Sequence, residues 1–444
     1  MKILISFLLF LASSSLFAQR QIGYQIDMTE NMSYDSAYGY CADACMQFTS
    51  QTLQWSQLET SEGVWNADGI GLANVMNIYY PAVDMPLMIN FAVTNTVVRE
   101  VPEDLMDINF DDVVMIDRFK TFVDTLFAHM PDVEMVAINI GNETDVMFGT
   151  DESEYLRFKT FLEAVRPYVK EKYFDLHGVD VPIGTTFTFG GIISPFAGDL
   201  CKFVNQNLDI ITTNYYPLDN DFIVHNPIAP ISNLDYLVDF YADLPHPIVF
   251  QECGYPSSSE CGSSESMQAD FITNLFTAWD THSARITHIS FFKSTDWDAA
   301  LAATIAEYYG FEDNPAFVGY LASVGLRTWP GNGTNKPAYE RLLCELNARS
   351  DDFCEANCSI DVEENPKVKV SLYPNPTHDR IAVSTKGHEP ISSFRVWNSS
   401  GRVEKEKTFP SDGLIDVSYL TAGAYTIELK SADTFTIARF IVVD

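Results

Sequence analysis

Short apolar runs alternate with longer amphipathic stretches from residue 21 to about residue 346, and no other feature of the chain limits its fold as strongly. Such alternation is typical of βα units, in which surface helices join the strands of a parallel sheet. The apolar runs predict eight strands, at 21–27, 50–56, 86–93, 134–141, 182–188, 208–214, 247–252 and 286–293. The amphipathic stretches predict helices at 68–80, 113–129, 152–172, 196–206, 231–243, 264–281 and 336–347, and the connection at 31–48 has no clear pattern.

Eight βα units in a segment of this length fit a (β/α)8 barrel, that is, a TIM barrel with some enlarged loops. A doubly wound open sheet is the alternative, and its dinucleotide-binding form requires a GxGxxG turn after the first strand. The first strand continues as IGYQIDMTEN, which contains no such turn. We therefore predict an α/β fold with a (β/α)8 barrel at residues 19–347 and no cofactor.

The rest of the chain predicts a second, smaller domain. Residues 348–367 are polar and acidic, include Pro366, and are predicted to form a linker. Residues 368–444 contain short alternating runs such as RIAVSTK, SSFRVWN and AYTIELK, which are separated by NP, SSG, SDG and TAG turn sequences. Alternation with a period of two between turn residues is typical of strands, so we predict a small all-β sandwich.

The first residues, MKILISFLLFLASSSLFAQ, combine Lys2, an apolar stretch and a small residue, Ala18, before a cleavage point. This combination is typical of a secretory signal peptide. A membrane anchor is the alternative, but the stretch is shorter than the ~20 apolar residues that a span needs. We predict a signal peptide at residues 1–18 and an exported mature protein.

All eight cysteines follow the predicted signal peptide. Export allows disulfides to form, but eight cysteines permit about 105 connectivities, so the sequence does not decide between them. A bridge between Cys253 and Cys261 would brace the loop after Glu252, and a reduced, buried Cys253 is the alternative. The chain has no CxxC repeat and no HExxH motif, and its histidines are scattered, so we predict no metal site.

The net charge of the chain is −34. Residues 367–444 hardly contribute, because they carry ten Lys and Arg against nine Asp and Glu, so the acidity lies in the barrel segment. Such a surface repels nucleic acids, anionic membranes and polyuronate chains, and no cluster of Lys and Arg offsets it. We expect a neutral substrate and no nucleic-acid binding, while acidity that serves solubility alone is equally compatible with this charge.

Two glutamates end predicted strands. Glu143 ends the apolar run in AINIGNETD, on the fourth strand, and Glu252 ends the run in PIVFQECGYP, on the seventh. A carboxylate at the end of a buried strand costs several kcal/mol to desolvate unless it is paired. Proteins therefore rarely place one at such a position unless it has a function. In a barrel both would lie at the mouth. The pair predicts a two-carboxylate active site, and the alternatives are a helix N-terminal carboxylate for Glu143 and a buried ion pair for Glu252.

These segments resemble the retaining glycoside hydrolases of the large (β/α)8 clan, clan A, in which an Asn-Glu pair ends strand four and a second Glu ends strand seven. INIGNETD and VFQECGYP carry the glutamates, WSQLETSEGVW is similar to the clan's second strand, and DIITTNYYP and SFFKSTDWD are similar to its sixth and eighth. The resemblance covers residues 21 to about 346. YYP and ECGYP are most similar to family 53 endo-β-1,4-galactanases, but the opening of the chain lacks that family's pattern, so we predict the clan and not the family.

The resemblance implies a secreted retaining glycosidase that is expected to act within a chain, with Glu143 as acid/base and Glu252 as nucleophile. Burial and the neighbouring anion should raise the pKa of the acid, and hydrogen bonds should keep the nucleophile ionised. Asn142 would bind the sugar hydroxyl next to the reacting carbon, or else cap the turn. One of Tyr215 and Tyr216 should reach Glu252, and the other would pack in the barrel.

Two tryptophans are candidate sugar-binding residues. Trp297 ends the eighth strand, where its indole face can stack on a pyranose, and core packing is the alternative. Trp55 lies on the second strand, where the sequence does not distinguish the inner from the outer face. Asp27 and Lys293 also lie near strand ends, without a decided role.

The tail resembles the C-terminal sorting domain of type IX secretion in Bacteroidota. LYPNPTHD opens it, WNSSGRV lies midway and LTAGAYTIEL leads to the last strand. This resemblance implies the type IX secretion machinery as a partner and a location outside the cell or on the outer-membrane surface. A carbohydrate-binding sandwich is the alternative for the tail. We expect a monomer that acts on a neutral polysaccharide or oligosaccharide.

Two functions of other classes are also compatible with the sequence. One is a non-catalytic glycan-binding protein on a barrel scaffold, and the other is a cell-surface adhesin in which the barrel is a spacer. Binding without turnover would indicate the first. A barrel mouth without aromatic side chains would indicate the second.

Overall fold

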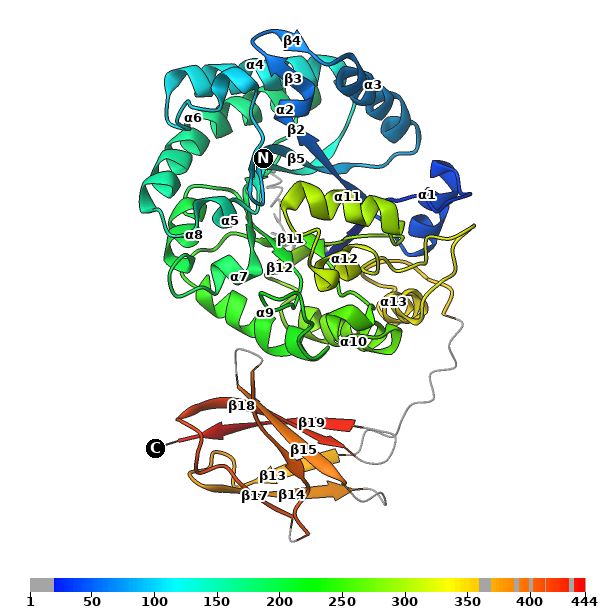
Figure 1. Ribbon diagram of the computed structural model, residues 1–444, viewed down its shortest axis with the longest axis vertical. Coiled ribbons are helices and arrows are strands. Elements are labelled where there is room, and N and C mark those ends of the chain that lie inside the picture. The colour runs from blue at the N-terminus through cyan, green and yellow to red at the C-terminus, as the bar shows by residue number, and fades with distance from the viewer. Residues whose placement is uncertain are drawn as a thin grey trace, which may run out of the picture.

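The computed structural model describes residues 20–358, 369–386, 391–398, 402–411, 413–430 and 435–443. The predicted signal peptide and residues 359–367 of the predicted linker lie outside these residues. Figure 1 shows a barrel of strands ringed by helices, and a second domain built of strands. Within the described part of the chain, no helix is both long and apolar enough to cross a membrane.

The barrel contains all eight predicted strands. They are β1 (Gln21–Tyr24), β2 (Phe48–Gln54), β5 (Leu87–Asn95), β7 (Met135–Asn142), the pair β8 (Ile183–Gly184) and β9 (Thr186–Thr188), β10 (Ile211–Tyr215), β11 (Ile248–Cys253) and β12 (Ile286–Phe291). Neighbours run parallel in the order β8, β7, β5, β2, β1, β12, β11, β10, β9. Since β8 and β9 are halves of the predicted fifth strand, separated by Thr185, the ring is nearly closed. The TIM barrel is confirmed, and the open doubly wound sheet is excluded.

The outer helices also follow the prediction. They are α1 (Tyr34–Asp43), which lies in the undecided connection, and α3 (Ala67–Ala82), α4 (Val113–His129), α6 (Glu152–His177), α8 (Gly198–Asn205), α9 (Ala229–Phe240), α10 (Glu265–Thr281) and α13 (Pro337–Asn347). Helix α4 is representative: the Asp112 side chain accepts a hydrogen bond from the backbone N–H of Val114 at its start, and Phe119 and Phe122 are buried against the barrel.

Several short elements lie in the loops, namely α2 (Trp55–Leu58), β3 (Glu59–Ser61), β4 (Val64–Trp65), β6 (Val98–Arg99), η1 (Glu103–Leu105), α5 (Thr144–Phe148), α7 (Phe189–Ile192) and η2 (Ser259–Cys261). Two further helices, α11 (Ala299–Tyr309) and α12 (Pro315–Leu321), follow β12 and were not predicted. Figure 1 shows both drawn across the strands of the barrel and not in the outer ring.

The second domain is a β-sandwich, as predicted. One antiparallel sheet contains β13 (Lys369–Tyr373), β14 (Arg380–Lys386) and β17 (Leu414–Asp416), and the other contains β16 (Val403–Thr408), β15 (Ser393–Asn398), β18 (Gly423–Lys430) and β19 (Phe435–Val442). Side chains of both sheets, including Ile381, Val396 and Ile427, form one buried cluster. Strand β16 was missed because its sequence, VEKEKT, is charged and largely exposed.

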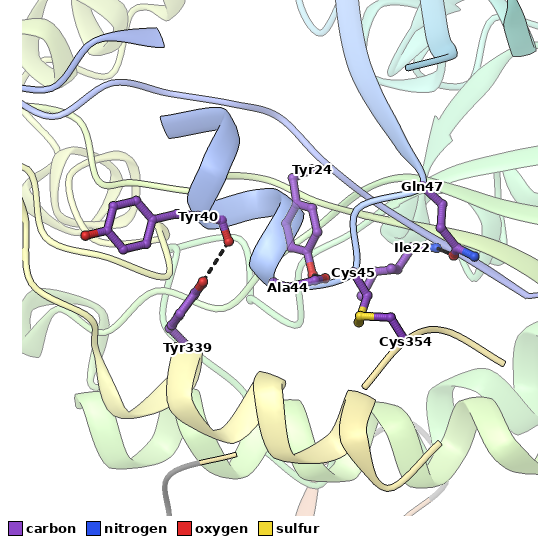
Figure 2. Close-up of a disulfide and its surroundings, with 8 residues drawn as sticks. All are labelled: Ile22, Tyr24, Tyr40, Ala44, Cys45, Gln47, Tyr339 and Cys354. Atoms are coloured by element: carbon purple, nitrogen blue, oxygen red, sulfur yellow. Dashed lines mark hydrogen bonds between the residues drawn. A yellow bond between two sulfur atoms is a disulfide. The ribbon is translucent and has the colours of Figure 1, made fainter. Parts of the chain in front are cut away.

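Two disulfides hold the segment after α13 to the barrel. Cys45 pairs with Cys354, which is 309 residues away, and Cys344 pairs with Cys358. Figure 2 shows the Cys45–Cys354 bond in the region where Tyr339 of α13 donates a hydrogen bond to the carbonyl of Tyr40, at 2.6 Å. The bridge between Cys253 and Cys261 that the sequence suggested is wrong.

Both of these cysteines are free and buried in the structure. The Sγ atom of Cys261 instead lies 3.2 Å from the carbonyl oxygen of Ala316, a buried residue in the first turn of α12. The loop after Glu252 is therefore braced by packing against α12 and not by a covalent bond.

The long disulfide should stabilise the barrel more than the short one. A cross-link restricts the unfolded chain more when it closes a longer loop, so the Cys45→Ser/Cys354→Ser variant should lose about 2–4 kcal/mol of unfolding free energy. The Cys344→Ser/Cys358→Ser variant, whose cysteines are separated by 14 positions, should lose less. Denaturant unfolding of both variants tests this order. An equal loss in the two would contradict it.

Candidate active site

Glu143 lies where β7 turns into α5. Gly141 has a φ of +88°, and Glu143 itself has a φ of +48°, which is in the left-handed region. A non-glycine residue there costs of order 1 kcal/mol or more and persists where the surrounding structure holds it. Residues held in this way cluster at functional sites. The backbone therefore marks Glu143 independently of its position at a strand end.

Two side chains from other strands hold the Glu143 carboxylate. The hydroxyl of Thr96 donates to Oε2 at 2.7 Å, and the Nδ2 amide of Asn214 donates to Oε1 at 3.0 Å. Thr96 follows β5, and Asn214 belongs to β10. The carboxylate thus lies at a point where three strands of the barrel converge.

Glu252 lies on β11 and is held by Tyr216. The Tyr216 hydroxyl donates to Oε2 of Glu252 at 2.7 Å. Tyr215 points the other way, because neighbouring side chains of a strand face opposite sides. It is fully buried, its ring packs against Phe250, and its hydroxyl accepts a hydrogen bond from Asn233. The structure thereby decides between the two tyrosines: Tyr216 reaches the glutamate, and Tyr215 packs outside the barrel.

A β-bulge sets the direction of the Glu252 side chain. Thr213 pairs with Phe250 and Asn214 pairs with Glu252, so Gln251 is an extra residue in β11. The bulge allows two consecutive side chains, those of Gln251 and Glu252, to reach polar groups of the barrel, whereas a regular strand would alternate them.

Asn142 belongs to a hydrogen-bond network below the two glutamates. Its Nδ2 donates to Asn95 at 3.0 Å, and its Oδ1 accepts from Asn214 at 3.1 Å and from Gln251 at 2.9 Å. The Oε1 of Gln251 accepts from Asn139 and Thr186, each at 2.9 Å. The amide orientation of Asn142 is therefore fixed.

The sequence analysis did not identify four polar residues of this site, namely Asn95, Thr96, Asn214 and Gln251. The signal that could have found them is a polar residue within or next to an otherwise apolar strand.

The electrostatics of the pair differ from the expectation. The pKa of Glu252 is raised to about 8, first by burial and second by the negative charge of Glu143, against the hydrogen bond of Tyr216 and the charge of Lys293. Burial and the charge of Glu143 therefore favour the protonated form of Glu252 in the free protein. Burial thus opposes the hydrogen bonds that were expected to keep Glu252 ionised.

Lys293 forms a buried cluster beside Glu252. Phe292 donates its backbone N–H to the carbonyl of Cys253, so Glu252, on β11, and Lys293, just after β12, lie at the ends of adjacent strands. The Lys293 side chain has no exposed surface, and its Nζ lies 3.1 Å from Oδ1 of Asp27 and 3.2 Å from the ring centroid of Trp297. Burial, opposed by Asp27, lowers the pKa of this ammonium group to about 8.

Trp297 is oriented by the same cluster. Its Nε1 donates to Oδ1 of Asp27 at 3.3 Å, and its ring meets that of Phe292 edge to face. The ring is half-buried, with the ammonium group of Lys293 on one face. The structure thus places Trp297 next to Lys293, in the same region of the mouth as Glu252.

The structure removes Trp55 from the candidate sugar-binding residues. Trp55 is fully buried, packs against Phe119 and Phe122 of α4, and donates its Nε1–H to Glu59 at 2.8 Å. The prediction for Trp55 is wrong because the residue faces the helices and not the mouth. Among the described residues, no group of three or more His, Cys, Asp and Glu side chains is arranged to hold a metal ion.

The raised pKa of Glu252 predicts a pH-dependent gain in stability for Glu252→Gln. Since folding raises this pKa from 4.5 to about 8, the wild type loses stability as pH rises through that range. Glutamine stays neutral, so the variant should gain about 1–3 kcal/mol at pH 9 and little at pH 5. Thermal unfolding at both pH values tests this, with the exposed Glu171→Gln as control. A gain of equal size at both would contradict the shift.

Comparison with known proteins agrees with this fold. Residues 371–443 match the family model "Secretion system C-terminal sorting domain", which confirms the prediction for the tail. No curated protein sequence matches the chain. The structure is similar to an exo-β-1,4-mannosidase from Opitutaceae bacterium strain TAV5, with a TM-score of 0.55 and 15% identity over 75% of this chain and 60% of that one.

It is also similar to a GH5_18 variant from Bifidobacterium longum subsp. longum in complex with Manβ1-4GlcNAc, with a TM-score of 0.56 and 16% identity over 76% and 80% of the two chains. A GH5_18 structure from Streptomyces cattleya in complex with GlcNAc has a TM-score of 0.56 and 13% identity over 75% and 80%. At these identities the likeness concerns the fold. The barrel fold implied by the resemblance to the (β/α)8 glycoside hydrolase clan is thereby confirmed.

Proposed function

We propose that the barrel is a retaining glycoside hydrolase that cleaves β-glycosidic bonds of a neutral polysaccharide or oligosaccharide. One observation carries the proposal: Asn214, whose Nδ2 donates to Glu143 at 3.0 Å, is the register partner of Glu252 on the neighbouring strand, so two glutamates from the ends of β7 and β11 meet at one point of the mouth. Glycoside cleavage requires such a pair on the two sides of the scissile bond. Thr96 and Asn214 donate hydrogen bonds to Glu143, and Tyr216 donates one to Glu252, so each carboxyl group is held in position by its own partners.

In the first step, the Glu252 carboxylate attacks the anomeric carbon while Glu143, in its acid form, protonates the departing glycosidic oxygen. In the second step, Glu143 takes a proton from water, and that water displaces Glu252 from the sugar. A proton must therefore lie on Glu143, and Glu252 must be ionised, when the bond breaks. The Tyr216 hydrogen bond and the charge of Lys293 favour this arrangement, because both stabilise an ionised Glu252.

We propose two substrate contacts. The fixed amide of Asn142, next to Glu143 in the chain, hydrogen-bonds the sugar hydroxyl beside the reacting carbon. The half-buried ring of Trp297 offers an apolar face to the pyranose, while Lys293 covers the opposite face. The exo-β-1,4-mannosidase and the GH5_18 complex among the similar structures make β-1,4-linked mannosides the first substrates to test.

We further propose that the tail addresses the protein to the type IX secretion machinery, since the matched family is a secretion sorting domain. The protein then acts outside the cell or on the outer-membrane surface of a Bacteroidota-type bacterium. The acidic barrel surface is consistent with a monomer that acts on a neutral glycan and not on nucleic acid.

Azide separates the two proposed roles. Glu143→Ala should lower kcat by about 10²–10⁴-fold on unactivated substrates. With an activated dinitrophenyl β-glycoside, azide should restore turnover of this variant as a β-glycosyl azide, because Glu252 still forms the covalent intermediate. Glu252→Ala should instead give the α-azide, because azide attacks the free face directly. NMR of the products distinguishes them.

The exposed Glu171→Ala is the control for both variants, and its activity should match the wild type. Full activity of either active-site variant would overturn the assignment. Binding of glycans without turnover by the wild type would indicate a glycan-binding protein in its place.

Lys293→Met should move the alkaline limit of activity upward. The positive charge of Lys293 lowers the pKa of Glu252, so without it the pair keeps its proton to higher pH. The alkaline limb of the kcat/KM profile should therefore shift up by roughly one pH unit. The double variant Asp27→Asn/Lys293→Met should show the same shift as Lys293→Met, and it does not leave Asp27 as an unpaired buried carboxylate. Lys293→Arg keeps the positive charge, so its alkaline limb should match that of the wild type. A shift to lower pH would contradict this account.

A further inference from the structure

Helices α11 and α12, with the residues that join them, form a cap over the barrel mouth, at residues 299–321. The buried face of α11 contains Ala302 and Ala306, with the half-buried Ile305 and Tyr309 beside them. These side chains share one apolar cluster with Phe317, Tyr320 and Leu321 of α12 and with Tyr216 and Trp297 at the mouth. The cap is therefore packed onto the site itself and not onto the outer helices.

Two tyrosines of the cap lie against the carboxyl pair. The charges of both Glu143 and Glu252 raise the pKa of Tyr309 and of Tyr320, second to burial. The Tyr320 ring also meets the Tyr216 ring edge to face, with centroids 5.3 Å apart, and Tyr216 is the residue that holds Glu252. The cap thus covers the place where the scissile bond would lie.

The end of α11 is fastened on the far side of the mouth. The hydroxyl of Tyr308 donates to Glu100, which is only 3% exposed and also accepts from Gln54 at 2.9 Å. Glu100 follows the β5–β6 hairpin, so α11 runs from the end of the eighth barrel strand to the end of the third. In the sheet order, β1 and β2 lie between these strands.

The cap is fastened on a third side through α12. Phe222, in the loop after β10, packs on Phe317 with ring centroids 4.6 Å apart and on Phe311 at 5.2 Å. Lifting the cap would expose these rings together with the rest of the cluster to water, at a cost proportional to the apolar area uncovered. The closed position is therefore the stable one.

We propose that this cap restricts the enzyme to chain ends and short oligosaccharides. The inference rests on the proposed function. A sugar bound inside a long chain must continue from the site on both sides. The cap obstructs the side of the mouth over β12, β1, β2 and β5. Because its attachments lie near β5 and β10, the side over β7 and β9 is left open, and the sugar chain can continue only there. Cleavage at chain ends thus takes the place of the cleavage within a chain that the sequence resemblance implied.

Product analysis of the wild type is the first test. The probes are 4-nitrophenyl β-glycosides and reducing-end-labelled β-1,4-hexaoses of mannose, glucose and galactose. We expect the accepted hexaose to lose sugars from one end in steps. An early mixture of internal fragments would overturn the role of the cap. If neither the aryl glycosides nor the hexaoses are cleaved, the proposed glycosidase function itself fails.

Variants test whether the cap causes the restriction. Tyr308→Phe removes the hydrogen bond to Glu100 and should raise the ratio of internal to terminal cleavage about tenfold, equivalent to about 1.4 kcal/mol. Tyr168→Phe is the matched control, because it removes a tyrosine–carboxylate hydrogen bond, to Asp124, on the outer surface. A second variant replaces residues 299–309 with a short Gly-Ser segment and should raise the ratio further. Unchanged products in both folded variants would overturn the inference.

Discussion

The mutual repulsion of two partly buried carboxyl groups is the constraint on which the arrangement of the barrel mouth depends. Glu143 and Glu252 come from strands that are distant in sequence, and the fold holds them within range of each other's charge. Thr96 and Asn214 stabilise one carboxylate, and Tyr216 holds the other. Hydrogen bonds and a nearby cation lower the cost of bringing such groups together but do not remove it. The remaining cost appears as the raised pKa of Glu252.

The polar interior of the barrel supports this geometry. Gln251 joins Asn139 and Thr186 to Asn142, and Thr212 donates to Asn139 at 2.8 Å. Buried amides are costly when unpaired, so a network in which each amide has partners favours one arrangement strongly. The side chains at the mouth are therefore oriented before any ligand arrives. Preorganised polar groups of this kind need no rearrangement when charge develops in a reaction.

The repeating part of the fold was predictable and the irregular part was not. Strands and outer helices follow from hydrophobic periodicity, and both glutamates could be found because carboxylates at the ends of apolar runs are conspicuous. The choice between Tyr215 and Tyr216 depended on the side-chain direction along β10, and the direction of Glu252 depended on the bulge at Gln251. Neither is encoded in composition or spacing. The cap was missed because its alanine-rich helix has a narrow buried face.

The Cys45–Cys354 bond has a consequence for the order in which the molecule matures. Its partners lie at opposite ends of the barrel sequence, so the bond joins the segment after the last helix to the start of the second strand, as Figure 2 shows in part. It also requires an oxidising environment, which the cytosol does not provide. Before that oxidation the barrel relies on packing alone, and afterwards its two ends can no longer separate. Covalent closure of the barrel is thus a property of the protein in an oxidising compartment.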